Sequence, residues 1–532
     1  MNITTTALSH LGIVAGIFDD LGIADIIDSA MPKTRDHNLP HSTIIKAMCL
    51  NGLGFNESRL SLYSEYFETL PTERLLGEGV LPEYLNDDAL GRTMDRIYEC
   101  GCTELFNQIA FKAMSDIPFG THVLNTDTTN FSLHGDYNNF DPNLNTIEIT
   151  YGHPKDMRWD LKRFVLSMVC NQEGIPLFVE TLSGNASDKK TLVETIKNIQ
   201  KGLKISDKVY HIADSAIYSD DNITKLGKHT LWITRVPATI TEAINLLNAD
   251  VKMKVCEDTR YSYYETTSSY GGIEQKWILF QSKDMKKRKE ETYDRKIEKH
   301  LKATKTSLKK LKKNEYACEE DAKRGAEKWL SEHPGYHFNE LSIESISHRK
   351  DGKKGRSKKD EVLEIHYVVK AEIEAEQERI IQERDKVGRF ILTTNDLDLK
   401  ADEVLSYYKS QSKIERGFRF LKDKSFHVSE VYLKKESRIE ALAMIMVLCL
   451  FLYSIAQWKL REGLKEANKF VRNQVKKQIQ NPTLKWIFFL FRRIAELTIQ
   501  LDEIVERKVA NMTDELWGIL DLMGPACVKY YL

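Results

Sequence analysis

The spacing of apolar residues changes in character several times along this chain. Over the first 118 residues, apolar positions recur every three or four residues, as at Leu11, Val14, Ile17 and Leu21. This is the period of an amphipathic α-helix. Asn86 and the two aspartates after it are typical of a helix start. We therefore predict a helical N-terminal region over residues 1–118.

The pattern becomes that of strands after residue 118. Segments 122–133, 163–170 and 175–182 are strand-like, and the sequence Asn-Gln-Glu-Gly of residues 171–174 is typical of a hairpin turn between the last two. These features predict a three-stranded antiparallel meander.

A helix and two further strands follow the meander. Residues 188–203 have the apolar spacing of an amphipathic helix, and segments 208–213 and 229–236 are strand-like. Three strands, a helix and further strands are the order of elements in an RNase H-like mixed sheet flanked by helices, an α/β fold. Residues 119–236 are thus predicted to be the first part of such a core, in which the first and fourth strands are neighbours.

The core pattern stops between residues 237 and 387. Short strand-like runs there alternate with a lysine-rich helix over 286–313, which predicts an inserted α+β domain. An apolar strand at 389–394 and a helix from residue 401 onward predict the second part of the core over 388–458. Residues 459–532 are predicted to be a helical C-terminal region.

One apolar run is long enough to raise the question of a membrane. Residues 441–456 are apolar for 16 positions, whereas a helix needs about 20 to span a bilayer. We therefore predict a buried core helix and no membrane contact. The first residues lack a basic region followed by an apolar run. We therefore do not expect export, and we expect a cytosolic protein.

Local charge differs sharply from the net charge of −1. Residues 1–120 carry 8 Lys and Arg against 17 Asp and Glu, whereas residues 286–313 carry 13 against 4 and residues 459–493 carry 10 against 2. Basic segments bind polyanions because they release condensed counterions. A solvated helix face has the same composition. Both interpretations of the two basic segments stay open.

Two kinds of site are not indicated by the sequence. The eight cysteines show no Cys-x-x-Cys pair and no accompanying histidine pair, so free thiols are expected and a zinc site is not. There is also no glycine-rich loop that ends in Lys-Ser or Lys-Thr, so ATP is not an expected partner.

Three carboxylates stand out as candidate chemistry. Asp127 and Asp214 lie in or directly after strand-like runs, and Glu415 lies at the edge of an apolar helical stripe. On a single helix, Tyr408, Gln411, Glu415 and Lys422 would be 0, 3, 7 and 14 positions along one side. The pattern predicts an acid flanked by phosphate-binding groups.

This spacing resembles the Tyr-Arg-Glu-Lys (YREK) signature of the DDE transposases of bacterial insertion sequences. Gln411 stands where that family has its arginine, which leaves the acid intact but removes a charged phosphate contact. An arginine restored there is expected to strengthen DNA binding a few-fold. Five further segments resemble family blocks in the same order, namely residues 125–130, 151–160, 183–188, 213–216 and 234–237.

The resemblance implies a nuclease and strand-transferase. Cleavage of a phosphodiester is helped by two divalent ions held by hard oxygen ligands. Asp127 would bridge two Mg²⁺ ions, Asp214 and Glu415 would each complete one, and Mn²⁺ should substitute. The expected partners are double-stranded DNA, as element ends and target, and a second copy of the chain in a synaptic homodimer. The expected DNA contacts are Tyr408, Gln411, Lys422, Arg235, Lys155 and Arg158.

Two other functions use the same residues. An RNase H-like nuclease without strand transfer would share every carboxylate, and a non-catalytic DNA-binding descendant would normally have lost one. The acidic N-terminal region is equally consistent with recognition of element ends and with oligomerisation.

Overall fold

The computed structural model describes residues 2–33, 37–54, 62–138, 146–154, 157–202, 208–349, 363–423, 433–501 and 504–532. The chain divides into two compact units. Unit 1 comprises Met1–Arg235, Thr267–Lys276 and Thr393–Leu532, and unit 2 comprises Val236–Thr266 and Trp277–Leu392. Lys155, one of the predicted DNA contacts, lies outside the described residues.

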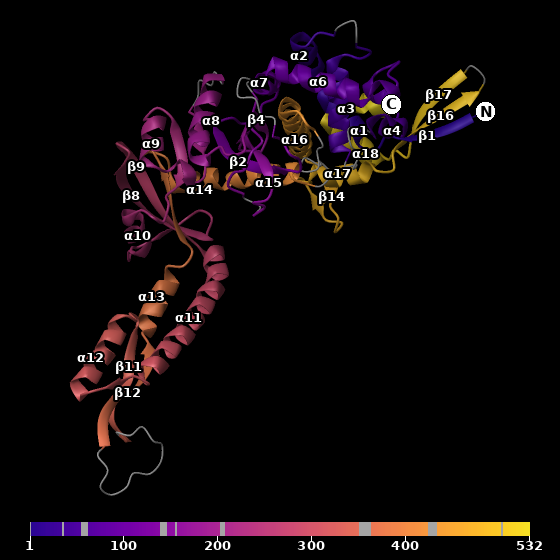
Figure 1. Cartoon of the computed structure of the whole chain (residues 1–532). Helices are drawn as coiled ribbons and strands as arrows, with labels where there is room; N and C mark the ends of the chain where they lie inside the picture. Colours follow the sequence, from indigo (N-terminus) through magenta and orange to yellow (C-terminus); the bar gives the residue numbers. More distant parts are fainter. Residues whose placement is uncertain are drawn as a thin grey trace. The chain divides into compact units, whose positions relative to one another are not determined.

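The N-terminal part of unit 1 is mostly helical, as predicted (Figure 1). The Asn86 side chain accepts a hydrogen bond of 3.0 Å from the backbone N–H of Ala89, which caps the predicted helix start. The helices here are α1 (Leu11–Asp20), α2 (Ile23–Ala30), α3 (His41–Leu53), α4 (Tyr63–Glu68), α5 (Thr72–Leu76), the 3₁₀ turn η2 (Pro82–Tyr84), α6 (Asp87–Cys100) and α7 (Cys102–Asp116).

The prediction of helix throughout residues 459–532 is wrong. Strand β1 (Asn2–Ala7) pairs with β16 (Ala495–Leu501), which pairs with β17 (Ile504–Ala510). Residues 495–501 alternate polar and apolar side chains, which is the period of a strand. A second hairpin is formed by β14 (Val471–Arg472) and β15 (Gln478–Ile479). The rest of this region contains α17 (Leu484–Phe491), α18 (Asp514–Met523), α19 (Pro525–Val528) and η6 (Lys529–Tyr531).

The mixed sheet predicted from the sequence is present. Its first strands are β2 (Val123–Leu133), β3 (Lys162–Asn171), β4 (Pro176–Ser183), β5 (Tyr210–Ile212) and β6 (Leu231–Arg235), in the spatial order β4-β3-β2-β5-β6. The β2–β3 and β3–β4 pairs are antiparallel, whereas β2–β5 and β5–β6 are parallel. A meander followed by parallel strands on the side of its first strand is the RNase H-like arrangement. The connecting elements are α8 (Asp188–Gly202), η3 (Ser215–Ile217) and α9 (Asp220–Leu226).

The strand order of this sheet continues with four more strands. They are β13 (Arg389–Thr394), β9 (Ile273–Ser282), β8 (Tyr261–Tyr270) and β7 (Lys254–Val255), so β13, β9 and β8 contribute residues to both units. Unit 2 has its own sheet in the order β10-β12-β11, formed by Glu315–Tyr316, Leu363–Ala375 and Tyr336–Arg349. Its helices are α10 (Thr241–Asn248), α11 (Lys283–Leu311), α12 (Glu319–Ser331) and α13 (Gln377–Asp385).

Three helices of unit 1 follow β13, namely α14 (Ala401–Lys409), α15 (Gln411–Leu421) and α16 (Glu436–Glu466). By length and composition α16 is apolar enough to cross a membrane, with a mean hydropathy of 2.3 in its most apolar window. However, 78% of that window is buried inside the protein, against α3, α6, α7 and β4 among others. The prediction of a buried core helix over residues 441–456 is confirmed.

Candidate active site

Asp127 lies on β2, and Asp214 lies two residues past the end of β5, the parallel neighbour of β2. Leu124 pairs with His211, and Asn125 pairs with Ile212. The same register, continued two residues beyond these pairs, would set Asp214 opposite Asp127. Residues opposite each other on neighbouring strands project to the same side of a sheet. The two aspartates, 87 positions apart in the chain, therefore follow neighbouring parallel strands toward the same end of the sheet.

The side of the sheet that carries Asp127 is the side covered by α15. Met168 is the cross-strand partner of Asp127 on β3, and its methyl group lies 3.4 Å from where a Cβ would stand on Gly417 of α15. Asn125, on the same face of β2, accepts a hydrogen bond of 2.8 Å from the Ser410 hydroxyl at the start of α15. Glu415 is therefore carried by the helix that packs over Asp127.

The expectation that Tyr408, Glu415 and Lys422 lie along one helix is wrong. Tyr408 belongs to α14, Glu415 to α15, and Lys422 is the residue that caps the end of α15. The two helices meet at Ser410, whose N–H bonds to the Tyr407 carbonyl three residues back instead of four. The Ser410 hydroxyl also bonds to that carbonyl, at 2.6 Å. A side chain that competes for the backbone carbonyls in this way interrupts a helix.

Tyr408 nevertheless lies among the charges of the site. Burial raises the pKa of its hydroxyl, the positive charge of Arg235 lowers it, and the negative charges of Asp214 and Glu415 raise it further. The net pKa is above its usual range, so the hydroxyl stays protonated at neutral pH. The side chains of Arg235, at the end of β6, and of Glu415 therefore lie within electrostatic reach of the same hydroxyl as Asp214.

Backbone groups orient the two aspartates. Asp127 accepts a hydrogen bond of 2.8 Å from the N–H of Thr128. Asp214 accepts one of 2.8 Å from the N–H of Ala216 and so caps η3. The Thr234 hydroxyl donates to the Asp214 carbonyl at 2.8 Å, which ties this turn to β6. Glu415, in contrast, is exposed on α15.

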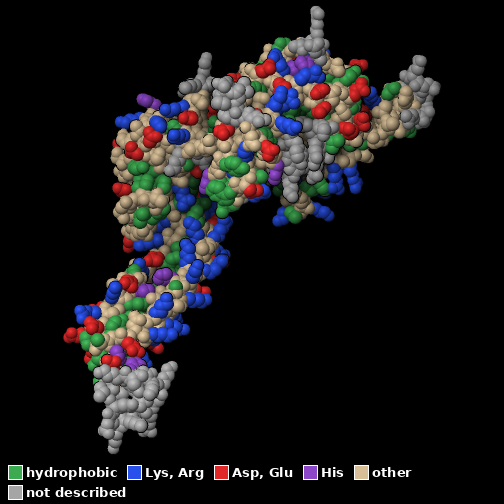
Figure 2. Space-filling model, viewed as in Figure 1, with side chains coloured by type: hydrophobic (Ala, Val, Ile, Leu, Met, Phe, Trp, Pro, Cys, Tyr) green, Lys and Arg blue, Asp and Glu red, His purple; other side chains and the backbone are tan. Residues whose placement is uncertain are grey.

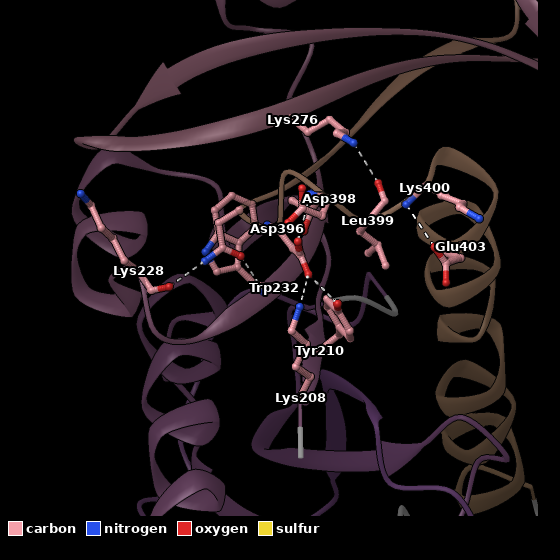
Figure 3. Close-up of polar contacts among 12 residues, drawn as sticks. Lys208, Tyr210, Lys228, Trp232, Lys276, Asp396, Asp398, Leu399, Lys400 and Glu403 are labelled. Carbon is pink, nitrogen blue, oxygen red and sulfur yellow. Dashed lines mark hydrogen bonds and ion pairs between the residues drawn. The ribbon is translucent and has the colours of Figure 1, made fainter. Parts of the chain in front are cut away.

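The loop between β13 and α14 is held by a residue that the sequence analysis did not single out (Figure 3). Asp396 is only 8% exposed and accepts hydrogen bonds from the Tyr210 hydroxyl at 2.6 Å and from Lys208 at 3.3 Å. The backbone N–H of Asp398 donates a third bond, at 3.1 Å. Burial tends to raise the pKa of Asp396, but these donors outweigh it, and the net pKa is lowered. Because Tyr210 belongs to β5, the cluster ties the start of α14 to the strand that leads to Asp214.

Neighbouring contacts strengthen the same connection. The Asn395 amide donates to the Thr230 carbonyl at 2.8 Å and accepts from the N–H of Trp232 at 3.0 Å. Lys276 donates to the Leu399 carbonyl at 3.0 Å (Figure 3). The sequence feature that could have indicated this cluster is the pair Asn395–Asp396 directly after the apolar strand. Asn and Asp side chains commonly form hydrogen bonds to nearby backbone groups.

The remaining predicted DNA contacts differ in their surroundings. Gln411 is only 8% exposed, and this burial speaks against the direct phosphate contact expected there. The Lys422 ammonium lies 5.5 Å from the centroid of the Phe131 ring, on the same face of β2 as Asp127. Arg158 is exposed and forms a bidentate pair with Asp160, with both N–O distances at 2.8 Å.

The carboxylates suit a hard divalent cation by their chemistry. Asp127, Asp214 and Glu415 supply oxygen ligands of the kind that Mg²⁺ and Mn²⁺ prefer. Among the residues that the structure describes, no three His, Cys, Asp or Glu side chains form a ready-made metal-binding group. Asp127 and Asp214 are supplied by neighbouring strands of the sheet and Glu415 by a helix that packs on it.

Two family models match this chain. Residues 126–452, which are more than half of the chain, match the family model described as a transposase DDE domain. Residues 3–111 match a family described only as a domain of unknown function. No curated protein matches the chain.

A solved structure, the Mos1 transposase in a paired-end complex with the left transposon end, is similar at 12% sequence identity with a TM-score of 0.15. The match covers 38% of this chain and 61% of that one. So low a TM-score does not support a residue-by-residue comparison.

Proposed function

Because this chain belongs to the transposase family with a DDE domain, we propose that it cuts DNA at the ends of an insertion sequence and joins the 3′-hydroxyls to target DNA. The proposed catalytic residues are Asp127, Asp214 and Glu415. The observation that supports the proposal is the parallel register of β2 and β5, which, continued two residues, would set Asp214 opposite Asp127 on the face covered by the helix of Glu415.

The three carboxylates would hold the divalent ions. Asp127, Asp214 and Glu415 would supply the oxygen ligands from the protein, and Mg²⁺ at such sparse sites usually keeps waters and substrate oxygens as its other ligands. Bound Mg²⁺ or Mn²⁺ would activate the attacking hydroxyl and stabilise the leaving oxygen. The backbone bonds to Asp127 and Asp214 keep these carboxylates oriented before DNA binds.

The neighbouring residues would position the phosphate. The protonated Tyr408 hydroxyl can donate a hydrogen bond to a phosphate oxygen. The Arg235 guanidinium offers paired donors that match phosphate geometry, and the Lys422 ammonium adds a further charge at the end of α15. These three groups come from different elements, β6, α14 and the end of α15, and would approach the phosphate from more than one helix.

A nuclease without strand transfer remains the competing function, because both reactions use the same carboxylates. The deciding experiment incubates the purified protein with Mg²⁺, a donor plasmid that carries both element ends and a separate target plasmid. We expect recombinant molecules in which donor 3′-ends are joined to the target. Cut donor without any joined product would show the nuclease alone, and an intact donor would overturn both.

The same plasmids test the proposed homodimer. Synapsis of two ends requires two active sites, so a donor with a single end should be cut more slowly than one with two ends. Equal cutting of both donors would contradict cleavage within a synaptic dimer.

A further inference from the structure

A short basic hairpin follows the long core helix of unit 1. It consists of β14 and β15, which pair Val471 with Ile479 and Arg472 with Gln478. Asn473 builds its tip, since its side-chain oxygen accepts hydrogen bonds from the N–H groups of Val475 at 3.0 Å and Lys477 at 2.9 Å. The tip is therefore an ordered turn with a defined shape.

The base of the hairpin is also fixed. The Trp486 indole donates to the Arg472 carbonyl at 2.7 Å, and the Gln480 amide donates to the Leu464 carbonyl at 3.2 Å. Arg461 of α16 donates to the Pro482 carbonyl at 2.9 Å. A hairpin held at both ends loses little conformational entropy when it binds a partner.

The hairpin and the helix after it are purely basic. Residues 467–494 contain seven Lys and Arg and no Asp or Glu. Lys469, Arg472, Lys476 and Lys477 are exposed, and none of them has a carboxylate partner within the described part of the chain. Figure 2 shows Lys and Arg side chains gathered where this hairpin projects. Such unneutralised charge attracts a polyanion.

Apolar side chains are exposed among these charges. Val475, at the tip, is 70% exposed, and Phe470, at the base, is 51% exposed. On α17 the Arg492 guanidinium stacks 3.8 Å from the centroid of the Phe489 ring. Arginine, lysine and exposed apolar residues together are the side chains that proteins place in DNA grooves.

Direct contacts connect the hairpin to the helix of Glu415. The Phe420 ring of α15 lies 4.7 Å from that of Tyr453 on α16, and the Tyr453 hydroxyl accepts a bond of 3.0 Å from the N–H of Lys485. Lys485 also pairs with Asp423, just beyond α15, at 3.7 Å. The base of the hairpin thus adjoins the end of the catalytic helix.

Further positive charges lie on α15 and on the last turns of α16. Arg416 is exposed on α15 and Lys465 is exposed on α16. Arg461, on the same helix as Lys465, is the residue that bonds to the Pro482 carbonyl just beyond the hairpin.

We propose that the β14–β15 hairpin binds double-stranded DNA beside the cleavage site, with its strands in a groove and its basic side chains on the phosphates. The major groove, about 12 Å wide, admits a two-stranded ribbon. The inference rests on the proposed function, because it assigns the hairpin to the duplex that the carboxylates would cut.

The first test removes charge from the hairpin. Arg472→Ala, Lys476→Ala and Lys477→Ala are combined in one variant, and affinity for a short random-sequence duplex is measured over a salt series without divalent ions. Each lost phosphate contact lowers the slope of log affinity against log salt by about 0.9, so the slope should fall by about 2–3. The matched control combines Lys112→Ala, Lys225→Ala and Lys323→Ala, three exposed lysines outside both basic segments, each paired with a carboxylate one helical turn away.

The outcomes separate the two proposals. An unchanged slope in the hairpin variant, or an equal fall in the control, would overturn the hairpin inference even if the wild-type protein cuts DNA. If the wild-type protein binds DNA through the hairpin but cuts none, the proposed function fails and the hairpin inference stands.

A second test changes the tip alone. Val475→Glu places a negative charge where the tip would meet the groove and should weaken duplex binding by about tenfold, the effect of about 1.4 kcal/mol. Val505→Glu is the matched control, because Val505 is an exposed valine, 52% accessible, on the other C-terminal hairpin. Equal affinities of the two variants would overturn the inference. Binding of the wild-type protein to anionic phospholipid vesicles but not to the duplex would also overturn it.

Discussion

The two sides of the candidate active site are built differently. The sheet side carries Asp127 and Asp214, which are partly buried and each bonded to a backbone N–H. The helix side carries Glu415, which is exposed on a helix that starts at an interruption. The sheet therefore fixes its carboxylates before DNA arrives, whereas the helix leaves its carboxylate room to adjust.

The largest expected effect on DNA cleavage comes from neutralising one of the three carboxylates, on the sheet side or on the helix side. Asp127→Asn, Asp214→Asn and Glu415→Gln should each abolish Mg²⁺-dependent plasmid cleavage, because a neutral amide is a poor ligand for a hard cation. Duplex binding in the absence of divalent ions should remain close to wild type. Asp220→Asn, which changes an exposed aspartate on α9, serves as the control. Cutting within about tenfold of wild type would remove that residue from the proposed site.

A change of side-chain length sharpens the comparison between the two sides. Asp127→Glu adds a methylene group to a partly buried strand position, so cleavage should be lost as fully as in Asp127→Asn. Glu415→Asp shortens an exposed side chain on α15, so measurable cleavage should remain, especially with Mn²⁺, which tolerates less regular coordination. Equal losses in the two variants would break the distinction between a fixed and an adjustable side.

The loop of Asp396 supports both sides, and its loss should cost stability. Asp396→Ala leaves the Tyr210 hydroxyl without its acceptor and should lower the free energy of unfolding by about 2–3 kcal/mol at neutral pH. Because the folded-state pKa of Asp396 is lowered, its stabilisation is present above the unfolded pKa of about 3.9 and is lost as the pH falls through the folded value. The unfolding free energies of wild type and variant should therefore begin to converge below about pH 4 and meet only below the folded-state pKa of Asp396. A difference that persists there would show that packing, not charge, is responsible.

The smallest effect is expected at Gln411. From the sequence, Gln411→Arg should strengthen DNA binding, but the burial of Gln411 reverses that expectation. A longer, charged side chain at a buried position should lower stability by about 1–2 kcal/mol and reduce cleavage at every salt concentration. A gain in cleavage at moderate salt that disappears at high salt would instead show that position 411 reaches DNA. Ser412→Arg, at the exposed neighbouring position, is the control.

The sheet could be predicted from sequence because its strands have a clear period and its order of elements is specific. The pairing of β2 with β5, the strands that lead to Asp127 and Asp214, followed from the same reasoning and is confirmed. The interruption at Ser410 could not be predicted, because helix-forming residues continue on both sides and one of the Ser410 hydrogen bonds involves Asn125, 285 positions away. Asp396 was missed for a related reason, since its partners Lys208 and Tyr210 are brought near by the fold alone. Strands β16 and β17 were missed although their alternation is visible in the sequence.

Strand β1 pairs with β16, which is synthesised almost 500 residues later. Near these strands, the Tyr531 hydroxyl bonds to the Ser9 carbonyl at 2.8 Å, and α19 packs against α1. A ribosome that adds about 5–20 residues per second makes residues 2–7 roughly half a minute to two minutes before residues 495–532. During that interval the first helices lack the partners that bury them. A nascent chain that stops before residue 495 therefore lacks the strand that pairs with β1 and the helix that packs against α1.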